Sequence, residues 1–296
     1  MKITIIGGSS FIGSNFVKLF SKKNYEIKYS YFKNTPLFKN GFQLDITNKE
    51  TTKEFFKNNK SDIVIISTAL TNVDLCETNP NLAEAINVKG TQNIIDACKN
   101  SNIKIIYIST SAVFDGKKSE YNEEDKPNPT SVYGATKLKG EKIVIESNNP
   151  YLILRTDQPY GWKERWQHTN SVIRVIENLE KDQSFNEISN WYNSPTFVPD
   201  FVNATKSLIK NELGGIFHLV GSDFISRYEW SQKVAEIFNL NKKLIKEIDS
   251  NDLKLPVKRV NVHLSNKKLD DMIGHKMIGI REGLQIMLNE QCQKSV

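Results

Sequence analysis

The chain has 296 residues, of which 39% are hydrophobic and 25% are charged, and its formal net charge is +6 at pH 7. This composition is typical of a globular protein, and the length suits one large α/β unit or two closely joined lobes. No apolar run approaches the roughly 20 residues that cross a bilayer, so no membrane association is expected. The first expected strand begins at residue 2, which leaves no room for a signal peptide.

The cysteines and the lysines argue against several classes of site. The three cysteines, Cys76, Cys98 and Cys292, are far apart and lack the spacing of metal ligands. Neither a disulfide framework nor a metal site is therefore expected, and the cytoplasm is the expected location. The lysines are scattered among Asn and Glu without an arginine cluster, which indicates a solvated surface and no nucleic-acid partner. A mild positive field would still help to capture a substrate that carries a diphosphate.

Strands and helices alternate through the first half of the chain. Short apolar runs predict strands, and apolar residues at helical spacing predict helices. The expected strands are 2–6, 25–31, 62–66, 103–108 and 151–154, and the expected helices are 12–20, 81–98 and 132–145. Repeated strand–helix–strand units imply right-handed crossovers and a parallel sheet with helices on both faces. The sequence therefore predicts an α/β protein with a Rossmann-type doubly wound sheet.

The second half of the chain is less regular. Residues 157–168 are expected to form a loop, followed by helices at 171–179, 201–209 and 228–238 and a strand at 216–220. Because this half carries fewer buried strands, it suits a smaller C-terminal lobe that binds substrate.

A glycine-rich turn, Gly7-Gly8-Ser9-Ser10-Phe11-Ile12-Gly13, follows the first strand and opens a helix. Glycine lets the backbone turn sharply and approach a pyrophosphate, and the helix N-terminus offers unpaired N–H groups. The middle glycine of the usual pattern is Ser10 here, so a slightly wider turn is expected. Strand, turn and helix in this order predict a dinucleotide site contacted by Gly7, Ser9, Ser10, Phe11, Ile12 and Gly13.

The end of the second strand bears on the choice of cofactor. It reads Ser30-Tyr31-Phe32-Lys33 and lacks the acidic residue that binds the ribose hydroxyl of NAD. Lys33 is a candidate for pairing with a 2′-phosphate, which favours NADP(H) and leaves NAD(H) open; the alternative is a plain surface lysine. Asp45 and Ile46 are candidates for contact with the adenine, and Asp45 has the alternative of capping the helix that starts near Asn48.

Tyr133 and Lys137 lie one helical turn apart in Tyr133-Gly134-Ala135-Thr136-Lys137, so that they share a helix face. A tyrosine with a pKa of about 10 is a poor acid or base at neutral pH. A neighbouring ammonium favours the phenolate, so Lys137 is expected to lower the pKa of Tyr133. Lys137 also has donors to spare for the ribose hydroxyls of a cofactor.

A cluster of hydroxyl groups, Ser109-Thr110-Ser111, follows the expected strand 103–108. The carboxyl ends of parallel strands are where doubly wound proteins bind ligands. A hydroxyl there can bind a substrate carbonyl and polarise it. These could be ordinary turn hydroxyls, but beside the glycine-rich turn and the Tyr–Lys pair they predict a catalytic set of Thr110, Tyr133 and Lys137.

The chain resembles the extended short-chain dehydrogenases of the NAD-dependent epimerase/dehydratase superfamily, and most of all the dTDP-4-dehydrorhamnose reductase family. The resemblance covers nearly the whole chain and rests on residues 7–13, 69–74, 87–91, 109–116, 133–137, Arg155, 193–196 and 215–219. It implies an NAD(P)-binding Rossmann domain over residues 1–155 and a substrate-binding lobe over 156–296. Segments such as 197–220 are expected to return to the first domain.

The resemblance also implies a reaction, the reduction of a 4-keto nucleotide-sugar as in dTDP-L-rhamnose biosynthesis. A hydride would pass from the nicotinamide to the keto carbon while Tyr133 gives a proton to its oxygen. Thr110 would hold that oxygen, and Lys137 would orient the cofactor ribose. Carried over by position, Ala69 would contact the cofactor, and the sugar would lie near Thr71, Ser111, Asn190, Trp191 and Thr196.

The two residues after Thr110 separate the relatives. Sugar-nucleotide 4,6-dehydratases carry Asp and Glu there, whereas this chain has Ser111 and Ala112, which disfavours a dehydratase. The reductases usually carry Asp and an aromatic residue, so this departure leaves the sugar and its nucleotide carrier open. Two alternatives are an epimerase of the same superfamily and a non-catalytic subunit like the regulatory β subunit of methionine adenosyltransferase. The sequence allows a homodimer without requiring one.

The second half offers weaker candidates for binding. Lys258 and Arg259 are candidates for the substrate diphosphate, with a solvated surface pair as the alternative. Trp162 and Trp166 are candidates for stacking on a nucleotide base, with packing within the loop as the alternative. His218 is expected to be a core residue and not a metal ligand.

Overall fold

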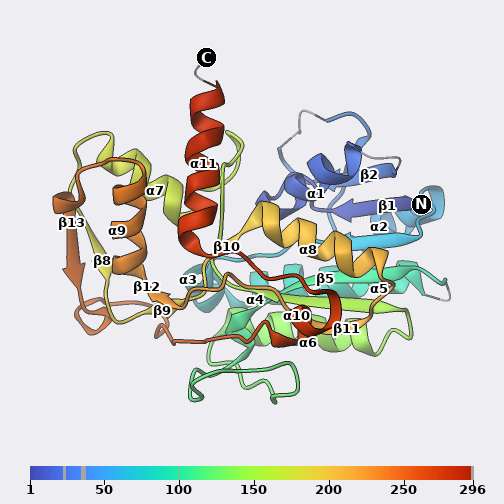
Figure 1. Ribbon diagram of the computed structural model, residues 1–296. Helices are drawn as coiled ribbons and strands as arrows, with labels where there is room; N and C mark the ends of the chain where they lie inside the picture. Colours follow the sequence, from blue (N-terminus) through green and yellow to red (C-terminus); the bar gives the residue numbers. More distant parts are fainter. Residues whose placement is uncertain (23–24, 35–37, 100, 295–296) are drawn as a thin grey trace.

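The protein is built around a seven-stranded parallel sheet in the order β11-β6-β5-β4-β1-β2-β3. The computed structural model describes residues 1–22, 25–34, 38–99 and 101–294 (Figure 1). The strands are β1 (Lys2–Ile6), β2 (Glu26–Tyr31), β3 (Gly41–Gln43), β4 (Ile63–Ile66), β5 (Lys104–Thr110), β6 (Tyr151–Thr156) and β11 (Gly215–His218). The strand order reverses between β1 and β4, where a doubly wound sheet opens a crevice for ligands. The predicted Rossmann-type doubly wound fold is confirmed.

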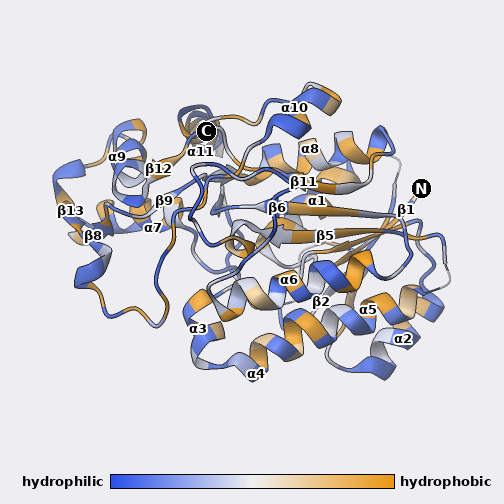
Figure 2. Cartoon of the chain, turned by 90° about the horizontal axis from the view of Figure 1, so that it is seen from below, coloured by the Kyte–Doolittle hydropathy of each residue, from blue (hydrophilic) through white to orange (hydrophobic). Residues whose placement is uncertain are grey.

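Helices cover both faces of this sheet, which Figure 2 shows nearly edge-on. One face carries α1 (Phe11–Ser21), α8 (Val198–Lys210) and α10 (Lys267–Ile273), and the other carries α2 (Lys49–Asn58), α5 (Thr91–Cys98) and α6 (Val132–Ile145). Ile5 and Ile65 pack into the first layer, whereas Ile6, Val64 and Ile66 pack into the second. Strands buried on both sides need the continuous β-branched sequence seen here.

The predicted helix 81–98 is present but is not a uniform α-helix. It consists of α4 (Pro80–Ala83), a π-helical segment (Glu84–Gly90) and α5. Asn87, in the π-helical segment, accepts a hydrogen bond from Leu70 N at 2.8 Å and donates one to Leu70 O at 3.1 Å. Asn87 thereby fixes the loop after β4, at the carboxyl edge of the sheet. Segments of π-helix are frequently found at functional sites.

The second half of the chain forms a smaller lobe with a core of its own. It holds α7 (Ser171–Leu179), α9 (Arg227–Ile237) and α11 (Ile280–Lys294), together with the parallel pair β8 (Phe185–Ile188) and β13 (Ile245–Ile248). Trp230 and Val234 of α9 lie in that core. The chain also returns to the large sheet, because β11 pairs with β6 and α8 packs against α1.

Several short elements were not predicted. They are β3, α3 (Val73–Thr78), β7 (Pro159–Tyr160), β9 (Tyr192–Asn193), β10 (Thr196–Phe197), β12 (Ile225–Ser226) and the 3₁₀ turns at 111–113, 242–244 and 250–252. The strands β8 and β13 and the helices α10 and α11 were not predicted either. Strands of two residues carry no alternation that a sequence pattern could reveal. In the part of the chain that the structure describes, no helix is both long and apolar enough to cross a membrane.

Candidate functional site

A cavity of about 680 Å³ lies at the carboxyl ends of β1, β4, β5 and β6. This volume lies within the range of small-molecule sites in proteins, about 300–1,000 Å³. Its walls come from the glycine-rich turn, the ends of β5 and β6, the start of α6 and two segments of the second lobe, 166–171 and 258–262. The cavity brings together these predicted site residues: Gly7, Ser9, Ser10, Phe11, Ile12, Ala69, Thr71, Thr110, Ser111, Tyr133, Lys137 and Trp191.

The turn after β1 has the geometry that a dinucleotide site requires. Gly7 has a φ of +85°, and a Cβ there would lie 2.2 Å from Thr68 Oγ1. Gly13 does not line the cavity; a Cβ on it would lie 2.1 Å from Gly7 O, so glycine is needed for the close approach of helix and strand. Ser10 has a φ of −67° and its side chain caps α1, accepting from Gly13 N. A serine therefore suits the position that usually holds glycine.

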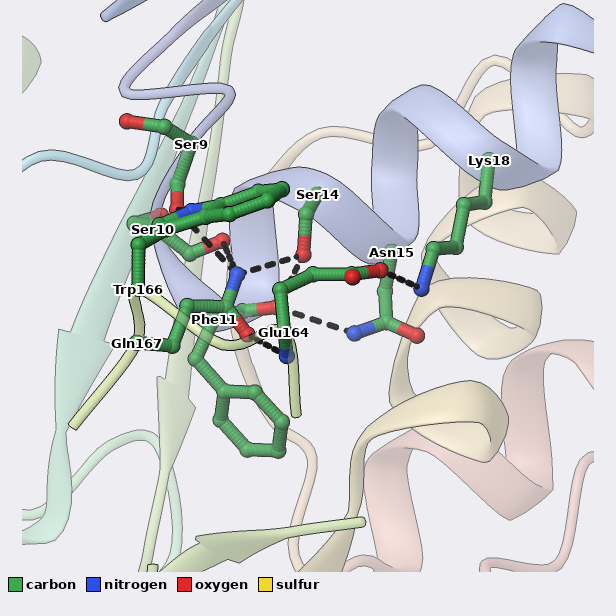
Figure 3. A network of polar contacts seen from close by, with 9 residues as sticks. All are labelled: Ser9, Ser10, Phe11, Ser14, Asn15, Lys18, Glu164, Trp166 and Gln167. Carbon is green, nitrogen blue, oxygen red and sulfur yellow. Dashed lines mark hydrogen bonds and ion pairs between the residues drawn. The ribbon is translucent and has the colours of Figure 1, made fainter. Parts of the chain in front are cut away.

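A segment of the second lobe binds this turn (Figure 3). The indole Nε1 of Trp166 donates to Ser9 O at 3.1 Å. The side-chain amide of Gln167 lies 3.1 Å from both Ser9 O and Ser10 O and 2.9 Å from Ser14 Oγ. These contacts occupy the carbonyl oxygens of the turn. The turn is thereby held in one conformation by residues more than 150 positions later in the chain.

An ion pair strengthens the same connection. Glu164 lies 2.6 Å from Lys18, on α1, and its backbone N–H donates to Gln167 Oε1 at 2.9 Å. Trp166, a candidate for base stacking, lines the cavity and donates its indole N–H to the turn. Trp162, the other candidate, lies away from the cavity lining and donates to Met287 O. Gln167 was not predicted, since nothing local in the sequence distinguishes it.

The predicted catalytic residues Thr110 and Tyr133 both line the cavity wall. Thr110 ends β5, and Tyr133 stands in the first turn of α6, where Ser131 is the N-cap. Burial raises the pKa of Tyr133 to about 12, although the nearby Thr110 hydroxyl opposes the shift. The expected lowering of the Tyr133 pKa is therefore wrong in this structure, because desolvation of the phenolate outweighs other effects. Tyr133 keeps its proton at neutral pH.

Lys137 lies one turn further along α6 and is almost fully buried. Its Nζ lies 3.9 Å from the centre of the Tyr107 ring. Burial lowers the pKa of Lys137 to about 7, and the carboxylate of Glu141 opposes that shift. Lys137 lines the cavity, where its amino group offers hydrogen-bond donors and can gain or lose a proton near neutral pH.

A buried ion pair connects α6, which carries Tyr133 and Lys137, to the neighbouring strands of the sheet. Arg155 on β6 donates to both carboxylate oxygens of Glu141 on α6, at 3.0 and 2.8 Å, and both side chains are buried. Ser109 on β5 donates to the same carboxylate at 2.5 Å.

His218 is a core residue as predicted, and burial lowers the pKa of its imidazole to about 3. Within the described residues no group of three or more His, Cys, Asp or Glu could hold a metal ion.

The sequence interpretation overlooked Asp157, which lies directly after β6 and lines the cavity beside the catalytic residues. Its carboxylate accepts hydrogen bonds from Ser111 Oγ at 2.9 Å and from Ser194 N at 2.8 Å. Burial raises the pKa of Asp157 to about 6. The available signal was its position at the carboxyl end of a parallel strand, the same argument that identified Thr110.

Positive charge gathers at the opposite wall of the cavity. Lys258 and Arg259, the predicted diphosphate candidates, both line it. The guanidinium groups of Arg259 and Arg227 lie 5.5 and 5.4 Å from the centre of the Trp191 ring. Arg259 is also paired with Asp74 at 2.6 Å, which fixes it against α3. Trp191 was predicted to lie near the substrate, and it does form part of this wall.

Besides Gly13, three of the expected cofactor contacts lie outside the cavity lining. Lys33 is exposed, with its Nζ 5.7 Å from the Phe32 ring, although Phe32 itself lines the cavity. Asp45 accepts hydrogen bonds from the backbone and hydroxyl of Thr47 at 2.9 and 2.7 Å. Its predicted alternative, capping of the next helix, is wrong, because Asn48 is the N-cap of α2. Ile46 is buried in the sheet core.

Two of the expected sugar contacts also lie outside the cavity lining. The side chain of Asn190 donates to Asp249 at 2.8 Å and accepts from Ser250 N at 2.9 Å, which links two loops of the second lobe. Thr196 is fully buried, and its hydroxyl bonds Ser194 O and Gly221 N. In this structure both side chains use their polar groups within the protein.

Fold and cavity together define a doubly wound α/β protein with a dinucleotide-type turn and a Thr–Tyr–Lys set in one site. The family model of the RmlD substrate binding domain matches residues 1–292, so the chain belongs to that family. The predicted resemblance to dTDP-4-dehydrorhamnose reductases is confirmed.

Relatives of two kinds are similar to the chain over almost its whole length. Methionine adenosyltransferase 2 subunit beta of Bos taurus is 27% identical over 294 residues, which cover 96% of this chain and 87% of that protein. The dTDP-4-dehydrorhamnose reductase of Aggregatibacter actinomycetemcomitans is 27% identical over 288 residues, covering 92% and 93%. The crystal structure of the dTDP-4-dehydrorhamnose reductase of Bacillus anthracis in complex with NADP superposes with a TM-score of 0.87 at 26% identity, covering 98% and 99%.

Proposed function

We propose that this protein is an oxidoreductase that uses NAD(P)H to reduce a 4-keto nucleotide-sugar, in the manner of the dTDP-4-dehydrorhamnose reductases. The observation that carries the proposal is that Thr110, Tyr133 and Lys137 line the same cavity as the glycine-rich turn. A phenol that stays protonated at neutral pH is the group that a reduction needs as proton donor.

The cofactor site in this proposal is the turn at residues 7–13. The positive φ of Gly7 turns the chain into α1, whose N-terminal N–H groups attract a diphosphate. In this proposal Lys137, which lines the cavity, binds the ribose hydroxyls. When bound, a nicotinamide cofactor supplies the reducing equivalents of the reaction. NADP(H) is favoured because β2 ends without an acidic residue, and the Bacillus anthracis relative was crystallised with NADP.

In this proposal each of the protein's own residues has a separate role at the substrate ketone. Thr110 holds the substrate oxygen, and Tyr133 gives up its phenolic proton to that oxygen as negative charge develops on it. Lys137 stabilises the phenolate that remains. Lys258 and Arg259 bind the diphosphate of the nucleotide at the opposite wall. In this scheme residues 1–155, with 197–220, form the cofactor domain, and the remainder of 156–296 forms the substrate lobe.

The test is to mix the purified protein with NADPH and dTDP-4-keto-6-deoxy-L-mannose and to follow the nicotinamide absorbance. Tyr133→Phe should lower kcat by roughly 100- to 10,000-fold, because it removes the proton donor, while NADPH still binds. Tyr228→Phe is the matched control, since Tyr228 lies on α9 away from the cavity lining, and it should retain full turnover. Equal rates for wild type and Tyr133→Phe would overturn the assignment.

The similarity to methionine adenosyltransferase 2 subunit beta supports a second candidate, a cofactor-binding subunit without turnover. The two candidates differ in a direct measurement. A regulatory subunit would form a stable complex with a methionine adenosyltransferase catalytic subunit and would leave NADPH unconsumed with every keto-sugar. The intact catalytic set in a cavity of substrate size favours the reductase.

A further inference from the structure

Asp157 lies beside the catalytic hydroxyl across the sheet. In the β5–β6 pair, Thr110 is the register partner of Thr156, and Asp157 is the next residue. The Asp157 side chain lines the cavity and is 8% exposed. Its carboxyl group is therefore accessible from the same space as the group that would hold the substrate ketone.

The protein satisfies only part of the hydrogen-bonding capacity of this carboxylate. Ser111 donates to Oδ1 and the backbone of Ser194 donates to Oδ2, so each oxygen has one of these bonds. An ionised carboxylate offers about four lone-pair sites. One site on each oxygen is thus left for another donor.

The charges around Asp157 do not neutralise it by direct pairing. Arg227, on α9, acts on it electrostatically and lowers its pKa. That guanidinium is directed elsewhere, because it donates to Gln158 at 3.0 Å and to Ser171 at 2.5 Å and lies 3.9 Å from Glu187. Tyr133, on α6, also interacts electrostatically with Asp157, whose negative charge raises the pKa of the tyrosine. A buried carboxylate in these surroundings is stabilised by a further hydroxyl donor.

The chemistry of a 4-keto sugar identifies that donor. The carbon on one side of the ketone, C5, carries the ring oxygen, so the only hydroxyl on a neighbouring carbon is at C3. When Thr110 holds the ketone oxygen, the C3 hydroxyl lies in the same cavity as Asp157, which follows Thr156, the register partner of Thr110. The carboxylate can accept from the C3 hydroxyl without giving up its bonds to Ser111 and Ser194.

Building on the proposed function, we infer that Asp157 is a specificity-determining residue that accepts a hydrogen bond from the C3 hydroxyl of the substrate. The substrate class is then narrower than 4-keto nucleotide-sugars as a whole. It comprises those with a free hydroxyl next to the ketone, and 3-deoxy sugars are excluded because they leave the buried carboxylate without its donor.

The experiment compares kcat/KM for dTDP-4-keto-6-deoxy-L-mannose and for its 3-deoxy analogue. Wild type should prefer the hydroxylated sugar by roughly 100-fold or more, as expected for a site built to bind a hydroxyl. Asp157→Asn fits the same space, and its amide can still bond Ser111 and Ser194. We expect its preference to fall below about tenfold, through loss of rate on the hydroxylated sugar alone.

The pH profile supplies a readout that a purely structural role would not move. In wild type, kcat/KM for the hydroxylated sugar should rise with pH through a pKa near 6, since the ionised carboxylate is the acceptor. Asp157→Asn should lack this acidic limb. Ser111→Ala should shift it to higher pH, because the Ser111 bond lowers the pKa of Asp157. Asp223→Asn, which alters a carboxylate that accepts from Ile280 N outside the cavity lining, should keep both the limb and the preference.

The outcomes are distinguishable. Turnover with the same preference in wild type and Asp157→Asn, or an acidic limb that survives in Asp157→Asn, would overturn the role of Asp157 and leave the reductase proposal standing. Failure of wild type to turn over either sugar would overturn both proposals.

Discussion

The contact between the second lobe and the glycine-rich turn makes a quantitative prediction for cofactor binding. Gln167→Met keeps the length of the side chain and removes its amide, which lies within 3.1 Å of Ser9 O, Ser10 O and Ser14 Oγ. An amide nitrogen has two hydrogens, so about two of these three contacts are full hydrogen bonds at one time. At about 0.5–1.5 kcal/mol each, the variant loses roughly 1–3 kcal/mol from the ordering of the turn.

A cofactor that binds the turn must then supply this ordering itself. Since about 1.4 kcal/mol corresponds to a factor of ten, the Kd for NADPH should rise by roughly 5- to 100-fold. Calorimetric titration of the purified variant with NADPH measures it. Trp162→Phe is the matched control. Trp162 belongs to the same segment as Gln167, but its 3.0 Å hydrogen bond goes to Met287 O, away from the turn. Loss of that bond should change the Kd less than twofold. Wild-type affinity in Gln167→Met would refute the idea that this segment orders the cofactor site.

Two further predictions concern stability. Glu141→Gln leaves the buried Arg155 guanidinium without its counter-charge, so the free energy of unfolding in urea should fall by about 3–5 kcal/mol; a loss below about 1 kcal/mol would contradict the role of the pair. A hydrogen bond to Asp200 raises the pKa of His275 in the folded protein. The protonated imidazole therefore stabilises the fold fully below the unfolded-state pKa of about 6.5, and this stabilisation is lost as pH rises through the folded-state pKa. The Tm difference between wild type and His275→Gln should therefore be larger at pH 5.5 than at pH 8.5, and equal differences would refute the coupling.

The sequence by itself determined the parts of this protein that depend on neighbours in the chain. The bounds of α6, Val132–Ile145, agree with the prediction, because apolar spacing is a local signal. The same holds for the turn at residues 7–13, since the positive φ of Gly7 is a property of one residue type. Tyr133 and Lys137 could be paired in advance because residues four apart share a helix face.

Only the tertiary structure decided which distant residues complete the site. Asp157 is hydrogen-bonded to Ser111 and Ser194, which are 46 and 37 positions away in the chain. Gln167 is hydrogen-bonded to the turn from more than 150 positions away. Because these partners are distant in the sequence, no local pattern predicts either contact. The protonation of Tyr133 was misjudged for a related reason. The proximity of Lys137 could be read from the spacing, but the burial that raises the Tyr133 pKa arises only when the β5 end, α6 and the second lobe enclose one cavity.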